Sequence, residues 1–269
     1  MIVRDRPSGL RLFLLLRGSI LQRIRWTLLF NTLLAAGVTL AHGSLFTFKI
    51  TLTPIAFTLM GLPLAIFLGF RNTTAYDRYW EGRKLWGELV LRTRNLSRQC
   101  LSLIELDQPV DPLNRAGDVR VRMVHRAIAF VHALRLHLRA QSDDALLQRW
   151  LPAADWPRVA QSSQRPDTIM QGMGQDLALC LRERRIDPCL AAGIDATLSA
   201  MTASAVSCER IRNTPVPFSY TLLLHRTAYL YCFLLPFGLV DTTGFMTPFV
   251  VAIVAYTFFG LDALGDEIE

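Results

Sequence analysis

The chain has 269 residues, of which 51% are hydrophobic and 19% are charged, and its formal net charge is +7 at pH 7. This composition is too apolar for an average soluble protein and too charged for one that lies in a membrane throughout, so we expect both membrane-spanning and water-exposed parts. The five cysteines form neither a CxxC motif nor a Cys/His cluster, which excludes a disulfide framework and a zinc site.

The first 25 residues form a basic segment with six Arg and one Asp. Apolar and basic residues alternate in it in a way that fits an amphipathic helix lying on the inner leaflet of a membrane. An alternative is a signal peptide, with Trp26 to Thr39 as its apolar region. The long amphipathic stretch before that region argues against a signal peptide. The residues of the expected interfacial helix are Leu10, Arg11, Phe13, Leu14, Leu15 and Arg17.

Two apolar segments follow, and each is long enough to cross a bilayer. Residues 26–48 contain 23 residues without a fixed charge, which as a helix cover about 34 Å against a hydrocarbon core of ~30 Å. Residues 52–70 form the second segment. Pro63 lies inside it and should bend the helix or leave a carbonyl without its hydrogen bond.

Two more apolar segments lie near the C-terminus, at residues 217–240 and 246–261. The first carries His225 and Arg226 in its N-terminal half. The second has only 16 residues and ends before a run of acids, so it must cross without tilt or beside other protein. Four crossings return the C-terminus, residues 263–269, to the side of the N-terminus.

Residues 71–216 form a charged body with 21 basic and 16 acidic residues. Amphipathic periodicity predicts helices over 74–106, 119–140 and 190–212, and Pro, Asp and Ser predict loops at 108–114 and 151–167. The loops on the other side of the expected membrane carry almost no fixed charge, so the positive-inside rule places this body and both termini in the cytoplasm. The expected domains are therefore 1–25, 26–70, 71–216, 217–262 and 263–269.

No motif supports catalysis or nucleic-acid binding. The sequence lacks GxSxG, HExxH, a P-loop and a dinucleotide fingerprint, so we expect neither an enzyme nor a cofactor. Asp77 and Glu81 lie one helical turn apart and could bind a metal, but basic neighbours such as Arg78 and Lys84 favour a salt-bridged collar. The basic charge is explained by topology, and no nucleic-acid partner is expected.

One apolar stripe lies in the second segment, where Leu62, Ile66 and Phe70 recur every four residues on one helix face. The small residues Gly61, Ala65 and Gly69 flank it and allow close contact between helices. The stripe by itself fits a helix-packing core or the lining of a pore.

Three long sequence motifs resemble the bestrophin family, specifically its bacterial branch. They are FLGFRNTTAYDRYWEGRKLWG, NTPVPFSYTLLLHRTAYLYCFLLPFGLV and MTPFV with the later YTFFGLDALGDEIE. The resemblance runs from Arg11 to Glu269 and is weak from about Asp107 to Asp187. It implies an all-α membrane protein with four transmembrane helices that continue into a cytosolic helical body. It also implies a homopentamer around a central pore.

The resemblance implies two constrictions in that pore. The family's apolar neck lies on the second membrane helix, and the matching positions are Leu62, Ile66 and Phe70. The cytosolic aperture of the family lies at the start of the helix before the third span, which places it at Cys189. Cysteine is smaller than the usual Ile or Val there, so a wider or thiol-sensitive aperture is expected.

The resemblance further implies a channel for monovalent ions in a bacterial inner membrane. Bacterial relatives look like cation channels, so we expect cations such as sodium, with chloride conduction as the alternative. Animal relatives are activated by calcium through an acidic cluster after the fourth span, and the sequence ends before that cluster would be complete, so no calcium dependence is expected. A non-conducting scaffold or sensor is the other alternative. A secondary transporter is disfavoured because no inverted repeat is visible.

Overall fold

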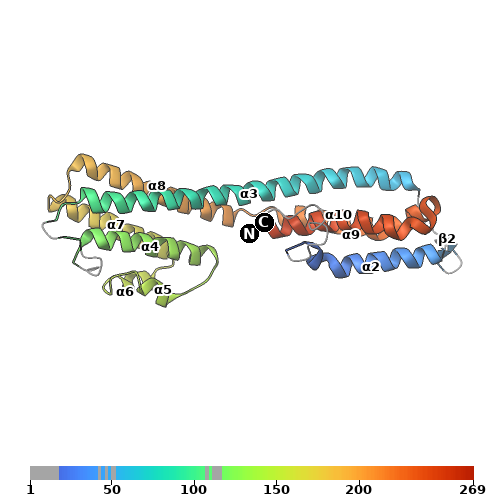
Figure 1. Cartoon of the computed structure of the whole chain (residues 1–269), viewed down its shortest axis with the longest axis horizontal. Coiled ribbons are helices and arrows are strands. Elements are labelled where there is room, and N and C mark those ends of the chain that lie inside the picture. The colour runs from blue at the N-terminus through green and yellow to red at the C-terminus, as the bar shows by residue number, and fades with distance from the viewer. Residues whose placement is uncertain (1–17, 42–43, 46–47, 50–52, 107–108, 111–116) are drawn as a thin grey trace. The chain divides into compact units, whose positions relative to one another are not determined.

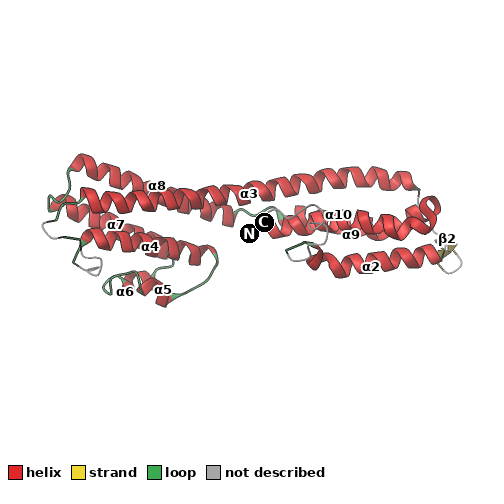
Figure 2. Cartoon of the chain, viewed as in Figure 1, coloured by secondary structure: helices red, strands yellow, loops and turns green. Residues whose placement is uncertain are grey.

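The computed structural model describes residues 18–41, 44–45, 48–49, 53–106, 109–110 and 117–269. Within these residues nearly all the regular structure is helical (Figure 2). The expected interfacial helix at Leu10 to Arg17 lies outside the described residues. The chain divides into two compact units, one formed by residues 1–79 with 215–269 and the other by residues 80–214.

The first unit is a helical bundle with a small hairpin (Figure 1). It contains α2 (Leu21–Leu40), the first half of α3 (Pro54–Leu103), α9 (Phe218–Thr243) and α10 (Thr247–Ile268). A 3₁₀ turn at Gly244–Met246 joins α9 to α10. Strands β1 (Ser44–Leu45) and β2 (Phe48–Lys49) pair antiparallel, with Ser44 opposite Lys49.

Helix α2 differs from the first apolar segment in both of its ends. It begins at Leu21, within the basic segment, and ends at Leu40, because residues 44–45 and 48–49 form paired strands instead of continuing the helix. Its 20 residues cover about 30 Å, the thickness of a hydrocarbon core, but among the described residues α2 is not one of the helices that are apolar enough to cross a membrane on composition. The expected span of residues 26–48 is therefore helical only in its first part.

Helix α3 confirms the expected continuity between the second apolar segment and the charged body. It runs for 50 residues through Pro63 without a break. Its buried residues Phe57, Leu64 and Leu68 lie on one face and pack into the core of the first unit. A single helix therefore carries both the apolar stripe and the first charged residues of the body.

The second unit has a separate hydrophobic core. It is built from the second half of α3 with α4 (Val119–Leu138), α5 (Asp144–Gln148), α6 (Trp156–Gln161), α7 (Arg165–Arg182) and α8 (Pro188–Asn213). The bounds of α4 and α8 agree with the predicted helices to within two residues.

The loop predicted over residues 151–167 is wrong in part, because α6 lies inside it and α7 begins at its end. Pro157 and Pro166, which led us to predict a loop, each occupy the first turn of a helix. Proline has no N–H to donate, and the first turn needs none, so it is favoured there. The predicted loop at 108–114 lies largely outside the described residues.

A buried charge cluster joins three helices of the second unit. Asp176 on α7 accepts hydrogen bonds from Arg122 and Arg126 of α4, and Arg126 also binds Asp155, the residue before α6. All four side chains are largely buried. Paired burial of this kind satisfies each charge and fixes the packing of α4, α6 and α7.

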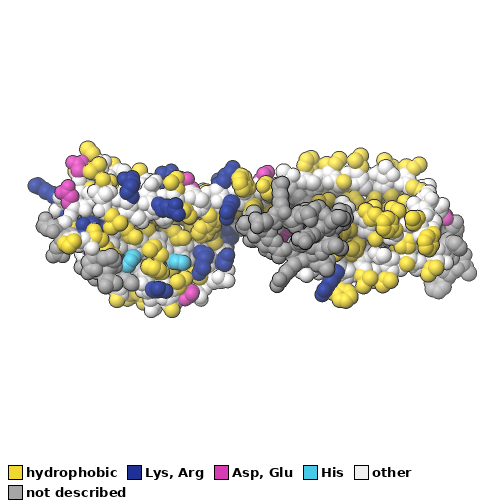
Figure 3. Space-filling view, viewed as in Figure 1, with side chains coloured by type: hydrophobic (Ala, Val, Ile, Leu, Met, Phe, Trp, Pro, Cys, Tyr) yellow, Lys and Arg dark blue, Asp and Glu magenta, His cyan; other side chains and the backbone are white. Residues whose placement is uncertain are grey.

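Three helical stretches of the described residues are long and apolar enough to cross a bilayer on length and composition: Pro54–Leu103, Pro188–Asn213 and the continuous run Phe218–Ile268. Figure 3 shows that hydrophobic and neutral side chains dominate the visible face of the first unit. Charged side chains are spread over the visible face of the second. The second stretch corresponds to α8, which sequence analysis placed in the body.

Candidate functional site: the apolar stripe of α3

The apolar stripe lies on the face of α3 that does not pack within the chain. Leu62, Ile66 and Phe70 are 66%, 47% and 61% exposed, although all three are large and hydrophobic. Two neighbours on the same helix, Leu64 and Leu68, are 3% and 0% exposed. The helical period therefore separates a buried face from an exposed apolar face, and exposed apolar surface of this kind calls for a partner or a function.

Close packing on the buried side fixes the rotation of α3. Phe57 lies against Gly238 of α9, where an added Cβ would overlap its ring. Gly61 lies against Tyr231 of α9, where an added Cβ would come within 2.8 Å of the hydroxyl oxygen. Of the two glycines expected to allow helix contact, only Gly61 does so among the described residues, because an added Cβ at Gly69 meets nothing within 4 Å.

A buried ion pair holds the helix directly after the stripe. Nη1 of Arg71 donates to Oδ1 of Asp262 on α10 over 2.7 Å, and its Nη2 binds Asp266. The Arg71 side chain is fully buried. Oδ2 of Asp262 lies 2.6 Å from Nδ1 of His225 on α9, so three helices meet at one carboxylate.

The sequence pointed to His225 and to the run of acids after the fourth segment, but it did not predict their pairing with Arg71. Arg71 follows the last apolar residue of the second segment, and Asp262 follows the last apolar residue of the fourth. A basic and an acidic residue at matching ends of two apolar helices is the signal that could have suggested the contact. In a low-dielectric bundle an unpaired charge at either position would cost much desolvation free energy. Pairing of the two side chains avoids that cost.

Cys189 lies in the first turn of α8 and is exposed. Asp187 caps that helix: its Oδ1 accepts the backbone N–H of Cys189 at 2.8 Å. The other four cysteines are buried. Cys189 belongs to the second unit and the apolar stripe to the first.

The predicted salt-bridged collar differs from the structure in the partner of Glu81. Glu81 pairs with Arg210 of α8 over 2.6 Å, within the second unit. Asp77 is exposed on the same side of α3 as the stripe, about two turns beyond Phe70. Among the described residues no group of three or more His, Cys, Asp or Glu side chains is arranged to hold a metal ion.

Comparison with known proteins gives consistent matches over nearly the whole chain. The family model described as "Bacterial/Fungal Bestrophin protein" matches residues 1–269. A voltage-dependent anion channel-forming protein of Mesorhizobium japonicum is 43% identical over all of this chain and 84% of its own length. The voltage-dependent anion channel-forming protein YneE of Escherichia coli is 38% identical over all of this chain and 85% of its own length.

A crystal structure of a bacterial bestrophin homologue from Klebsiella pneumoniae superposes with a TM-score of 0.84 and is 34% identical. The match covers 92% of this chain and 89% of that one. The agreement in sequence and in fold extends across both units. The chain therefore belongs to the bacterial and fungal bestrophin family, which is a family of ion channels and not of enzymes.

Proposed function

We propose that the chain forms a homopentameric channel for monovalent ions, with Leu62, Ile66 and Phe70 as its neck and Cys189 as its cytosolic aperture. The observation that carries this proposal is the exposure of the three large apolar side chains on α3, opposite a closely packed face. Five copies of that face around an axis make three apolar rings. Such rings can lose water and block ions when they narrow.

The proposed topology has four spans. They are α2, the first part of α3, α9 and α10, in a bacterial inner membrane with both termini in the cytoplasm. Helix α8 is apolar enough to span, but Ile194, Leu198 and Met201 are buried in the core of the second unit. A helix whose apolar face already packs in such a core has no need of lipid, so we assign α8 to the cytosolic body.

Cations are the first candidate for the permeant ion. Asp77 is the first charged residue beyond the neck on the same face of α3, and Asp187 lies two residues before Cys189. Rings of carboxylates at these places would attract cations and repel anions.

Anions are the second candidate, because the relatives from Mesorhizobium and Escherichia are named as anion channel-forming proteins. Those names do not support the sequence-based expectation of a sodium channel. Reversal potentials in a gradient of sodium chloride separate the two candidates, since cation and anion selectivity give potentials of opposite sign. If the channel selects cations, an Asp77→Asn variant should move the reversal potential away from the value expected for a cation-selective channel.

Unitary currents in planar bilayers test the channel proposal. Ile66→Ala or Phe70→Ala widens an apolar ring and should raise the open probability or the conductance. Leu33→Ala, a change of an exposed leucine on α2, is the matched control and should leave currents unchanged. Mass measurement in detergent checks the subunit number. Well-folded pentamers without currents in any variant would favour a non-conducting scaffold, and any number other than five would remove the basis for the residue assignments.

A further inference from the structure

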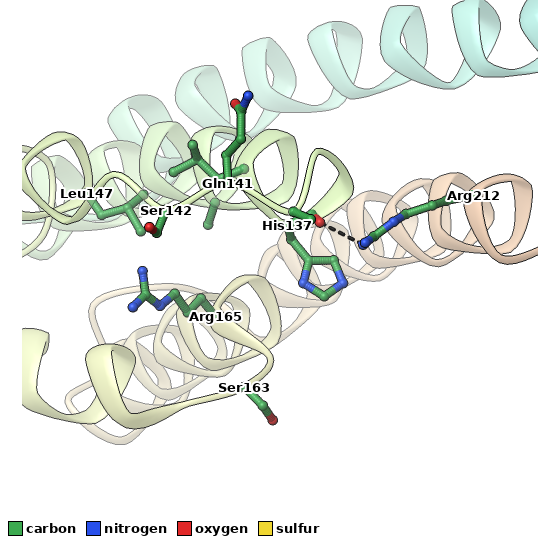
Figure 4. Close-up of a pocket in the computed structure, with 10 residues that line it drawn as sticks. His137, Gln141, Ser142, Leu147, Ser163, Arg165 and Arg212 are labelled. Atoms are coloured by element: carbon green, nitrogen blue, oxygen red, sulfur yellow. Dashed lines mark hydrogen bonds between the residues drawn. The ribbon is translucent and has the colours of Figure 1, made fainter.

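The second unit contains a cavity that the channel proposal does not use. Its volume is about 270 Å³, which corresponds to roughly nine water molecules. The end of α4, the start of α7 and the end of α8 surround it (Figure 4). A pocket of this size suits a small molecule rather than a peptide or a lipid chain.

The floor of the cavity is apolar and its rim is polar. Ala133, Leu136 and Leu147 are buried and form apolar parts of the wall. The polar residues Gln141, Ser142 and Ser163 also line the cavity, although the amide of Gln141 is directed away from the two arginines (Figure 4). The chain turns sharply at Ala140, whose φ of 50° ends α4 and brings the next residues into the wall.

Two arginines supply the charge of the cavity, and none of the described residues that line it carries a carboxylate. Arg165 comes from the start of α7 and Arg212 from the end of α8. Among the described residues, each arginine donates side-chain hydrogen bonds through Nη1 alone. Arg165 donates to Asp144 and Arg212 donates to the carbonyl oxygen of His137, both over 2.7 Å. In Figure 4 the dashed line marks the second of these bonds. The guanidinium of Arg165 also lies over the ring of Trp156, 5.8 Å from its centroid. The N–H groups that donate neither of the two hydrogen bonds remain for a ligand.

The acidic partners of the cavity's basic groups all lie outside its wall. Asp144 pairs with Arg165, and Glu209 lies 3.5 Å from Nε2 of His137. Asp144 is about half exposed, so water screens much of its charge. The wall itself therefore presents a positive field to whatever occupies it.

We propose that this cavity binds a small soluble organic anion, whose carboxylate or phosphate head is attracted by the positive charge of Arg165 and Arg212 and whose short apolar body lies against Ala133, Leu136 and Leu147. Arginine binds such heads with paired, charge-assisted hydrogen bonds. The apolar wall favours a short hydrocarbon body over a fully hydrated ion such as chloride.

The test is calorimetric titration of the full-length protein in detergent with hexanoate, and with hexanamide as its neutral isostere. Hexanoate should bind once per chain, and hexanamide at least about tenfold more weakly, because one lost charge-assisted hydrogen bond is worth about that factor. Inorganic phosphate should compete with hexanoate for the same site. Equal binding of hexanoate and hexanamide, or no hexanoate binding, would overturn the proposal.

Variants assign the binding to this cavity. Arg165→Gln and Arg212→Gln should each weaken hexanoate binding at least about tenfold, while Arg182→Gln, an exposed arginine of α7 outside the cavity, should not. Ser163→Leu fills the rim from an exposed position and should abolish binding without disturbing the core. It also serves as the reference for any uptake of hexanoate by the detergent. Unchanged binding in Ser163→Leu would show that the ligand sits elsewhere.

Discussion

Nη1 of Arg71 donates to Oδ1 of Asp262 over 2.7 Å, between residues that lie 191 positions apart in the chain. The contact links α3 to α10 one residue after Phe70, the last member of the proposed neck. Because Asp262 also contacts His225 of α9, loss of the arginine would leave a carboxylate with one partner in place of two. The same contact holds Phe70 on the unpacked side of α3.

Arg71→Gln should therefore destabilise the first unit by about 3–5 kcal/mol, the usual cost of breaking a buried ion pair from one side. In thermal unfolding in detergent this should lower Tm by roughly 6–20 °C. Arg92→Gln breaks the half-exposed pair between Arg92 and Glu88 and should cost less than about 1 kcal/mol. Equal melting temperatures for the two variants would contradict the importance given to the Arg71 pair.

Much of the helical layout was predictable because its signals are local. The 50-residue helix α3 follows from an unbroken apolar run that passes directly into an amphipathic one, and α4 and α8 follow from their periodicity. The end of α2 at Leu40 was not predicted, because apolar content alone does not distinguish helix from the hairpin that follows. Prolines at 157 and 166 misled the prediction because their effect depends on their position in a helix.

The contacts around the stripe were less predictable. That Leu62, Ile66 and Phe70 share a face follows from spacing, but which face of α3 packs inside the chain depends on α9 and α10. The partner of Glu81 is an example: reach along the helix favoured Arg78 or Lys84, whereas Arg210 arrives from 129 positions away. Pairings of this kind are tertiary, and a single sequence does not encode them in any local pattern.

The close approach of Gly61 to Tyr231 gives a second prediction. Gly61→Ala would place a Cβ 2.8 Å from the tyrosine hydroxyl oxygen and should cost about 1–3 kcal/mol through overpacking. Removing that oxygen with Tyr231→Phe should recover part of the loss, so the double variant should unfold at a higher temperature than Gly61→Ala alone. Gly69→Ala, where the added Cβ meets nothing within 4 Å, is the control and should be neutral or stabilising. No recovery in the double variant would mean that the clash is not with the hydroxyl.

The pH dependence of stability should contain a contribution from His132 on α4. Burial, with a further effect from the positive charge of Arg135, lowers the pKa of His132 below its ordinary value of 6.5. As the pH falls through 6.5, His132 of the unfolded chain binds a proton while His132 of the folded chain stays neutral. The free energy of unfolding therefore decreases from pH 6.5 down to the pKa that His132 has in the folded chain. Between about pH 7.5 and pH 5, the Tm of His132→Gln should therefore fall by less than the Tm of the native chain. Parallel Tm curves for the two proteins would refute this contribution.

The exposed thiol of Cys189 offers a direct test of the proposed aperture. The other four cysteines are buried, and burial raises the pKa of Cys100 to about 12, which keeps that thiol protonated at neutral pH. A methanethiosulfonate reagent should thus modify one site per native chain, as mass spectrometry would show. If five copies of Cys189 surround the exit of the pore, a cationic reagent should reduce cation current more than an anionic reagent of similar size. The opposite order would indicate anion conduction. Cys189→Ser channels should be insensitive to both reagents, and full modification of native channels without any change in current would place Cys189 away from the ion path.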